Sequence, residues 1–342
     1  MILKDDFITT SGVLALSNLQ AQIEGIQARV QAGLGSVTNR SELIELVSLR
    51  GLILGQITDY QWTEKQSEHL VCEFPTESLA FIARARTRAT FHRFTEALMD
   101  LDEAQQYGAE PQAVDIERAG IFQAIGEYDQ AIALFRTATE RQADFVSLSA
   151  LAALHAEFGD TTIAEQFFEQ SQHSYRGASP IPLALIEFQR GHMWMSTGDL
   201  HCAHHWFRIA HRRLPGYAPA QGHLAEVEAE FGETETAINR LMPLTISSDD
   251  PDYCVALSRI LLKIGRTAES NAWSTKAAAR YNDLISRHPE AFADHAAAFW
   301  LEVGSDPARA LSLAKLNLKI RQTPKAKKLF DRATHACARV DS

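Results

Sequence analysis

The residues best suited to chemistry lie in one histidine-rich tract, HMWMSTGDLHCAHHWFRIAH, over residues 192–211. Imidazole, thioether and thiolate groups are ligands that zinc and copper accept, so the tract raises the hypothesis of a metal site. Metal ligands must converge on one point, and no set here has a standard zinc spacing. We therefore interpret the tract as surface histidines and predict no metal, with a metal-binding or enzyme-accessory role around residues 192–226 as the alternative. The members of the tract are His192, Met193, Met195, His201, Cys202, His204, His205 and His211.

Other signatures of catalysis are missing from the sequence. It contains no GxSxG, HExxH, GxGxxG or P-loop pattern, which are the local signals for nucleophiles, zinc and nucleotide phosphates. The paired carboxylates Asp249 and Asp250 stand beside Pro251 and predict a turn. We therefore predict that the protein is not an enzyme and needs no cofactor. The four cysteines form no CxxC pair, which argues against a disulfide framework; they are Cys72, Cys202, Cys254 and Cys337.

The charge is negative overall and unevenly distributed. The net charge is -10, and because a nucleic-acid backbone is bound through a basic surface, no nucleic acid is predicted as a partner. Residues 301–342 nevertheless carry +5, which leaves -15 on the remainder. We interpret this basic end as a solvated terminal helix that complements the acidic body, with a docking patch for an acidic partner as the alternative.

The sequence also bears on location. No apolar stretch reaches the roughly 20 residues that a membrane helix needs, so no membrane association is predicted. The first twenty residues show no basic segment leading into an apolar run and no small-residue cleavage site. We therefore expect a cytoplasmic protein.

The elements that position these residues follow a repeat of about 34 residues. Small residues recur at intervals of 34, 34, 33, 39, 34 and 33 residues, at Thr63, Ala97, Ala131, Ala164, Ala203, Ala237 and Ser270. A second column, five residues before the first, reads Thr58, His92, Gly126, Gly159, Gly198, Gly232 and Gly265. Small residues let two helices cross closely, and glycine ends a helix in the left-handed conformation. The pattern predicts one helical hairpin per repeat and a solenoid of stacked hairpins.

These columns resemble the tetratricopeptide repeat (TPR) family over about residues 46–323. The match is most specific around Ala131, Ala203 and Ala237, and it is degenerate in the first and seventh units, where Thr63 and Ser270 replace alanine. The resemblance implies an all-α fold, a right-handed superhelical solenoid of about eight helix-turn-helix repeats. It also implies a concave groove lined mainly by the first helix of each hairpin.

We predict three parts: an N-terminal capping helix in residues 1–40, the solenoid in residues 41–324 and a basic C-terminal capping helix in residues 325–342. Apolar residues spaced by three and four predict a helix over about residues 11–33 that covers the first hairpin; they are Leu16, Leu19, Ile23, Ile26 and Val30. The alternative is that this stripe forms the seam of a homo-oligomer.

Two insertions interrupt the period. The first lies near residues 171–182 and predicts an extended helix and loop, with a kink near residues 172–182. The second lies near residues 278–292 and predicts a helix lengthened by two turns.

Alignment with the family's groove positions gives the candidate binding residues. His223 and Glu226 stand one helical turn apart and His192 comes from the preceding hairpin, so we expect these three side chains to converge. They would either hydrogen-bond a peptide or form a metal or proton-relay site. The groove positions that the resemblance implies are Arg86, Gln123, Phe188, Gln189, His192, Met195, His223, Glu226, Glu230, Arg259 and Lys263.

Arginine also recurs, at Arg50, Arg84 and Arg118, each 34 residues after the last, with Arg190 at the matching position two units later. An anion site is one interpretation of such a column. We favour a structural role, in which the side chains pack between helices and their guanidinium groups reach carboxylates. The function predicted from all of these features is a non-enzymatic scaffold or adaptor that binds a peptide or partner protein in its groove.

Overall fold

The computed structural model describes residues 8–340 of the 342-residue chain. These described residues form eighteen α-helices and no strand, which confirms the predicted all-α fold. The helices are α1 (Gly12–Gln31), α2 (Val37–Leu54), α3 (Ile57–Glu73), α4 (Ser78–Thr90), α5 (Phe94–Gln106), α6 (Pro111–Ile125), α7 (Tyr128–Arg141), α8 (Phe145–Glu157), α9 (Thr161–Ser174), α10 (Ile181–Thr197), α11 (Leu200–Arg213), α12 (Ala218–Glu230), α13 (Thr234–Ser247), α14 (Asp252–Lys263), α15 (Thr267–Arg287), α16 (Pro289–Leu301), α17 (Pro307–Ile320) and α18 (Pro324–Val340).

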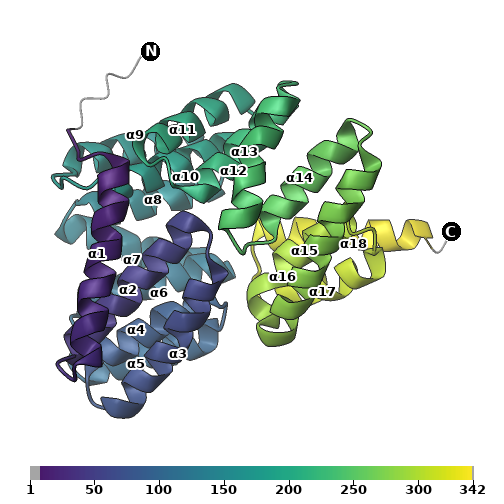
Figure 1. The fold of residues 1–342 in the computed structure, drawn as a ribbon. Helices are drawn as coiled ribbons and strands as arrows, with labels where there is room; N and C mark the ends of the chain where they lie inside the picture. Colours follow the sequence, from purple (N-terminus) through teal and green to yellow (C-terminus); the bar gives the residue numbers. More distant parts are fainter. Residues whose placement is uncertain (1–7, 341–342) are drawn as a thin grey trace.

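The helices pair in chain order into hairpins, from α2 with α3 to α16 with α17 (Figure 1). Small residues stand where the two helices of a hairpin cross. Ala119 and Ala131, in α6 and α7, are fully buried. In the α10–α11 hairpin, a methyl group on Gly191 would lie only 2.5 Å from the ring of Phe207. The small columns therefore set how closely the helices approach.

The glycine column ends the first helix of several hairpins. Gly126 and Gly198 have φ angles of 94° and 87°, in the left-handed region that favours glycine. His92 takes the same place after α4 with φ of 57°. Its Nδ1 lies 3.1 Å from the carbonyl oxygen of Glu290, and its ring stacks on Phe94. These contacts hold a histidine in a conformation that costs most other residues energy.

Both insertions lie where the period predicted them. The first forms the loop between α9 and α10 and lengthens α10 to 17 residues. The second lengthens α15 to 21 residues, whereas α13 has 14. The additional seven residues equal about two helical turns, so the predicted helix extension is confirmed.

Helix α1 packs on two parts of the solenoid that are distant in sequence. Leu19 and Ile23 are buried in one core cluster with Val47 of α2 and with Leu214 and Tyr217, which lie between α11 and α12. Figure 1 shows α1 crossing the first hairpins and reaching toward α9. The apolar stripe of α1 is therefore covered by the chain's own helices.

The turns of the early hairpins contact the loops of the late ones. The Asp249 carboxylate, between α13 and α14, accepts a hydrogen bond of 3.0 Å from the backbone N–H of Thr58 in the first turn of α3. The backbone N–H of Gln322, between α17 and α18, donates to the carbonyl oxygen of Ile125 at the end of α6, at 2.8 Å. Together with His92 and Glu290, these contacts make the solenoid return on itself.

Candidate interaction site

Nine of the predicted groove residues lie on α10, α12 and α14, and six of these line two adjoining hollows. One hollow, of about 160 Å³, is lined by Met195, Glu226, Glu230, Arg259 and Lys263, among others. The other, of about 330 Å³, shares Glu226 and Arg259 and adds His223. His192 of α10 lies beside His223, with ring centroids 5.9 Å apart. We call this surface, formed by α10, α12 and α14, the concave wall.

Ion pairs link the concave wall from helix to helix. Nδ1 of His223 lies 2.9 Å from the Glu226 carboxylate, and Arg259 of the next hairpin contacts the same carboxylate at 3.1 Å. Arg259 also reaches Glu302 at the end of α16, at 2.7 Å. Lys263 and Glu230 form a parallel pair at 2.9 Å. Positive and negative groups therefore alternate along the wall.

The surroundings shift pKa values within the wall. Crowding by protein atoms around the exposed His192 ring, and the adjacent His223, lower the pKa of His192 to about 4. Burial opposes ionisation of Glu226, but the hydrogen bond and charge of His223 and the charge of Arg259 outweigh it and lower the pKa of its carboxyl. Of the three side chains expected to converge, His223 and Glu226 are hydrogen-bonded to each other, and His192 adds a ring contact with His223.

The other four predicted groove residues line neither hollow: two lie on α4 and α6, and two on α10. Arg86 of α4 contacts Glu117 of α6 at 2.8 Å and also pairs with Glu45 of α2. The Gln123 side chain of α6 donates to Glu157 of α8 at 3.1 Å. These two residues join first helices in the early half of the chain.

The remaining pair is on α10. Phe188 packs against Phe207 and Tyr217, with ring centroids 5.6 and 5.2 Å apart, and so belongs largely to the core. Gln189 is exposed.

Sequence reasoning missed a second polar cluster at the far edge of the larger hollow. Nδ1 of His295, in α16, lies 2.7 Å from the carboxylate of Asp252 in α14. The charges of Asp252 and Asp294 raise the pKa of His295 to about 10. Burial and the charge of Asp252 raise the pKa of Asp250 to about 7. The available signal was His295 itself, which stands two residues before Ala297 as His223 stands two residues before Ala225. Its partner, however, is 43 residues away.

The arginine column has the structural role that we favoured. Arg50 contacts Asp59 at 2.6 Å, and Arg118 contacts Asp102 at 2.5 Å. Arg190 is almost fully buried and pairs with Glu165. Each guanidinium therefore meets a carboxylate of a neighbouring helix.

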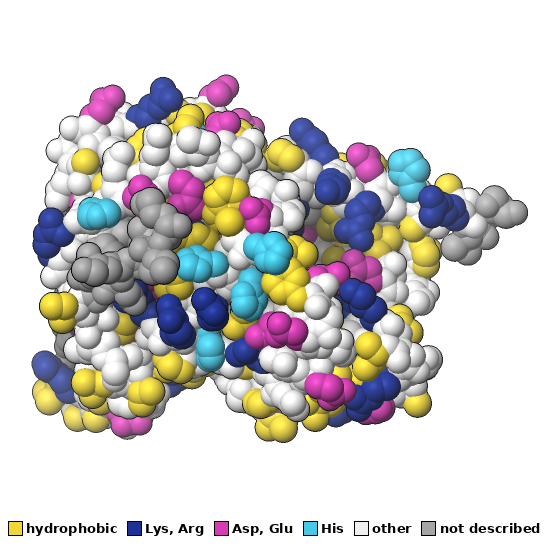
Figure 2. Space-filling model, turned by 90° about the horizontal axis from the view of Figure 1, so that it is seen from above, with side chains coloured by type: hydrophobic (Ala, Val, Ile, Leu, Met, Phe, Trp, Pro, Cys, Tyr) yellow, Lys and Arg dark blue, Asp and Glu magenta, His cyan; other side chains and the backbone are white. Residues whose placement is uncertain are grey.

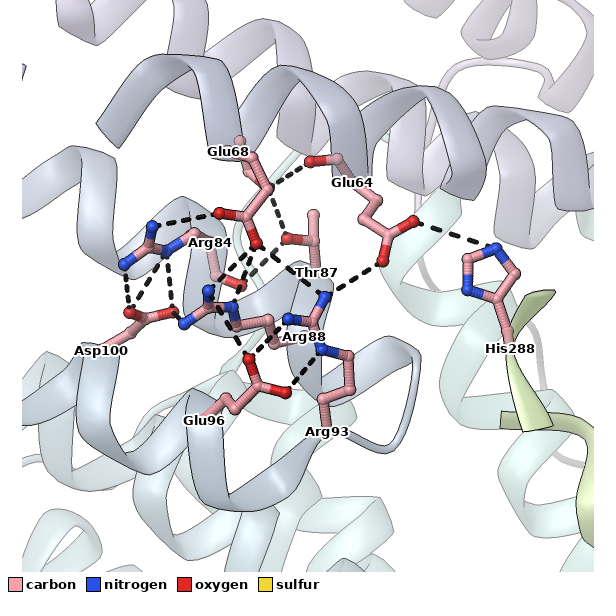
Figure 3. A network of polar contacts seen from close by, with 10 residues as sticks. Glu64, Glu68, Arg84, Thr87, Arg88, Arg93, Glu96, Asp100 and His288 are labelled. Atoms are coloured by element: carbon pink, nitrogen blue, oxygen red, sulfur yellow. Dashed lines mark hydrogen bonds and ion pairs between the residues drawn. The ribbon is translucent and has the colours of Figure 1, made fainter. Parts of the chain in front are cut away.

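Arg84 belongs to a larger network of three helices, shown in Figure 3. Arg84 and Arg88 of α4 each contact both Asp100 of α5 and Glu68 of α3, at 2.7 to 3.1 Å. His288, before α16, lies 3.9 Å from Glu64 at the edge of this network. These arginines are neutralised by the chain itself, which leaves them unsuited to an anion site.

The histidine tract divides between two surfaces. His192 faces the concave wall, whereas His201 and His204 of α11 pack on the ring of Phe231, with centroids 4.8 and 5.7 Å away. Figure 2, which looks down on the side where α11 lies, shows histidines gathered beside Lys and Arg side chains. Over residues 8–340, no three His, Cys, Asp or Glu side chains are placed to hold a metal ion together.

The described helices include none with the length and apolar character needed to cross a bilayer. No protein-family model matches the sequence. No curated protein matches it either. Solved structures do match the fold.

One similar structure is the human IFIT1 dimer with m7Gppp-AAAA, at a TM-score of 0.58 and 12% identity over 93% of this chain and 77% of that one. The human IFIT1 dimer with PPP-AAAA gives 0.57 at 14% identity, over 89% of this chain and 74% of that one. Another is the APC/C hetero-tetramer Cut9-Hcn1, at 0.51 and 15% identity over 91% of this chain. The chain spans about half, 52%, of that chain's length. At these identities the likeness shows the fold, and the chain is a TPR-like solenoid, as its repeat columns predicted.

Proposed function

We propose that the protein is a non-enzymatic scaffold whose concave wall binds a peptide or an extended segment of a partner protein. The observation that carries this proposal is the pair of adjoining hollows on α10, α12 and α14. There, charged groups of both signs, such as Glu230 and Lys263, stand beside the apolar side chains of Met195 and Leu200. An extended peptide offers backbone donors, backbone acceptors and apolar side chains together, which suits such a mixed surface.

The charge of the wall favours a protein ligand over a nucleic acid. The IFIT1 structures hold PPP-AAAA and m7Gppp-AAAA, but the wall here presents Glu226, Glu230 and Glu302 between its cations. Carboxylates repel phosphate groups, and nucleic-acid binding needs an excess of positive charge. Cytoplasmic location is part of the same proposal, supported by four free cysteines, which are typical of a reducing compartment.

The division of labour along the chain is also a proposal. Residues 1–40 and 325–342 would act as caps, and residues 41–324 would carry the binding surface. Support comes from α1, which covers core residues of α2 and α12, and from α18, which packs on α16 and α17. A kink near residues 172–182 stays a prediction.

The test is binding of an immobilised peptide library by the wild type and by the double variant His223→Ala/Arg259→Ala. We expect peptides selected by the wild type to lose at least about tenfold in affinity, since each change removes one charged or hydrogen-bonding group from the wall. Arg136→Ala is the matched control, because Arg136 is exposed on α7, away from the wall. Equal affinity of all three proteins for the selected peptides would move the binding surface elsewhere.

A further inference from the structure

A third hollow, of about 290 Å³, lies between α16, α17 and α18 and is strongly basic. Four Lys and Arg side chains line it, Arg321, Lys325, Lys328 and Arg332, together with His295 and the Asp294 carboxylate. Arg321 is paired with Asp294 at 3.2 Å, and Arg332 with Glu302 at 3.2 Å. Two of the four Lys and Arg side chains are therefore neutralised by the chain.

Lys325 and Lys328 are different. Both are exposed, and neither has an ion pair or a side-chain hydrogen bond with any residue in the described range 8–340. They stand in the first turns of α18, where the helix dipole adds further positive potential. An anionic group placed there would meet two free ammonium groups.

The positive charge continues along α18. Lys328, Arg332, His335 and Arg339 line the adjoining hollow of about 380 Å³, together with Asp331. Their spacing of four, three and four residues places them on one face of the helix. Lys325 to Arg339 spans about 21 Å at 1.5 Å per residue, which an extended segment of about six residues would follow. Lys325, Lys328, Arg332 and Arg339 are thus arranged in a row, with His335 between the last two.

The floor of the first basic hollow adds a second, independent feature. Asn317 of α17 lines this hollow and is 2% exposed. Its Oδ1 is buried and has no hydrogen-bond partner among the residues that the structure describes. A buried acceptor without a partner costs about 1–3 kcal/mol, so this position favours a ligand that brings an N–H donor.

We propose that the surface formed by α16, α17 and α18 binds an acidic extended segment of a partner protein. Its carboxylates would pair with Lys325, Lys328 and the row of cations along α18, and a backbone N–H would reach Asn317. A sulfate ion has no hydrogen to donate to Asn317, and a nucleic acid would face the -15 charge of residues 1–300 beside a short basic row. This surface adjoins the concave wall, whose larger hollow shares His295 and Ala298 with it, and the proposal goes beyond the function proposed for that wall.

The test is fluorescence anisotropy with a labelled octapeptide of glutamate, against the same peptide made of glutamine. We expect the glutamate peptide to bind the wild type with an affinity that falls as salt rises, and the glutamine peptide to bind at least tenfold more weakly. Lys325→Glu/Lys328→Glu should weaken glutamate-peptide binding at least about tenfold. The matched control is Lys315→Glu/Lys319→Glu, which makes the same charge change at two exposed lysines of α17 and should bind like the wild type.

Further arms separate the alternatives. Circular dichroism of each variant checks that the fold is kept. Lys263→Ala, a change in the concave wall at a residue paired with Glu230, should keep full affinity for the glutamate peptide, which separates binding here from binding at the wall. The proposal is overturned if the two charge reversals weaken binding equally, or if an octauridylate binds the wild type more tightly than the peptide. It is also overturned if light scattering shows a dimer that Lys325→Glu/Lys328→Glu dissociates, because a second copy would then be the occupant.

Discussion

At the scale of single residues, the size of one side chain decides how closely two helices pack. Gly191 faces the buried ring of Phe207, and an added methyl group would lie 2.5 Å from it. Gly191→Ala should therefore destabilise the protein by about 1–3 kcal/mol, the usual cost of overpacking a core. Gly120→Ala is the matched control, because nothing lies within 4 Å of the added methyl group in α6, and it should stabilise by about 0.5–1 kcal/mol. Chemical denaturation measures both, and equal effects would contradict this account of the small column.

The polar cluster near Asp250 predicts a pH dependence of stability. The pKa of the Asp250 carboxyl is raised from 3.8 to about 7, first by burial and then by the charge of Asp252. The stability linked to this group is complete below pH 3.8 and is lost as the pH rises through 7. Asp250→Asn keeps an acceptor for the N–H of Asp252, which lies 2.9 Å away, and removes the charge. Between pH 5 and 8 the variant should therefore gain stability relative to the wild type, on the order of 1 kcal/mol.

Urea unfolding across that pH range measures the gain. Asp129→Asn, an exposed change on α7, should follow the wild type at every pH. If the free energies of unfolding of Asp250→Asn and the wild type differed by the same amount from pH 5 to 8, the pKa of the Asp250 carboxyl would be the same in the folded and unfolded states.

At the scale of elements, α1 contributes to the core. Ile23 is fully buried between α2 and the α11–α12 connection. Ile23→Asp should lower stability by several kcal/mol, since it removes a buried apolar side chain and buries a charge. Gln22→Asp places the same charge on the exposed side of α1 and should change stability by less than about 0.5 kcal/mol. Thermal unfolding compares the two; similar melting temperatures would mean that α1 is not docked in solution.

The elements were the part of the structure that the sequence predicted best. Hairpins repeat because Ala131 and its equivalents repeat, and the longer intervals marked the loop before α10 and the two additional turns of α15. The pairing of His295 with Asp252 was missed because it joins first helices of successive hairpins across the groove, and no repeat column records that neighbour. The positive charge of α18 could be counted from the sequence. The hollows beside that helix could not be predicted, because they depend on how α18 packs on α16.

At the scale of the whole molecule, the turns of early and late hairpins touch. Repeat spacing encodes contacts between neighbouring hairpins, whereas contacts such as Asp249 with Thr58 join residues 191 apart. Those contacts depend on the small rotation from each hairpin to the next, which accumulates along the solenoid. The stacking of hairpins into a solenoid could therefore be predicted from the repeat, whereas the contacts between early and late turns could not.

Asp249→Ala tests that return contact. It removes the carboxylate that caps the start of α3, and loss of such a cap costs about 1 kcal/mol. The amides of Ile57 and Thr58 should then exchange with solvent about five- to tenfold faster. Asp283→Ala is the control, because Asp283 shares the partner Arg280 at 2.9 Å but caps no distant helix. If the exchange rates of these two amides were unchanged in Asp249→Ala, Asp249 would not cap α3 in solution.

The joints between early and late turns have a mechanical consequence. A solenoid whose ends make no contact with each other can unfold one repeat at a time from either terminus when it is stretched. Here hydrogen bonds join the starts or ends of α3, α4 and α6 to late loops of the chain. Force applied to the termini must therefore break several of these bonds before any hairpin can unfold. We expect force–extension curves recorded with optical tweezers to show one large unfolding event, and not a series of small ones.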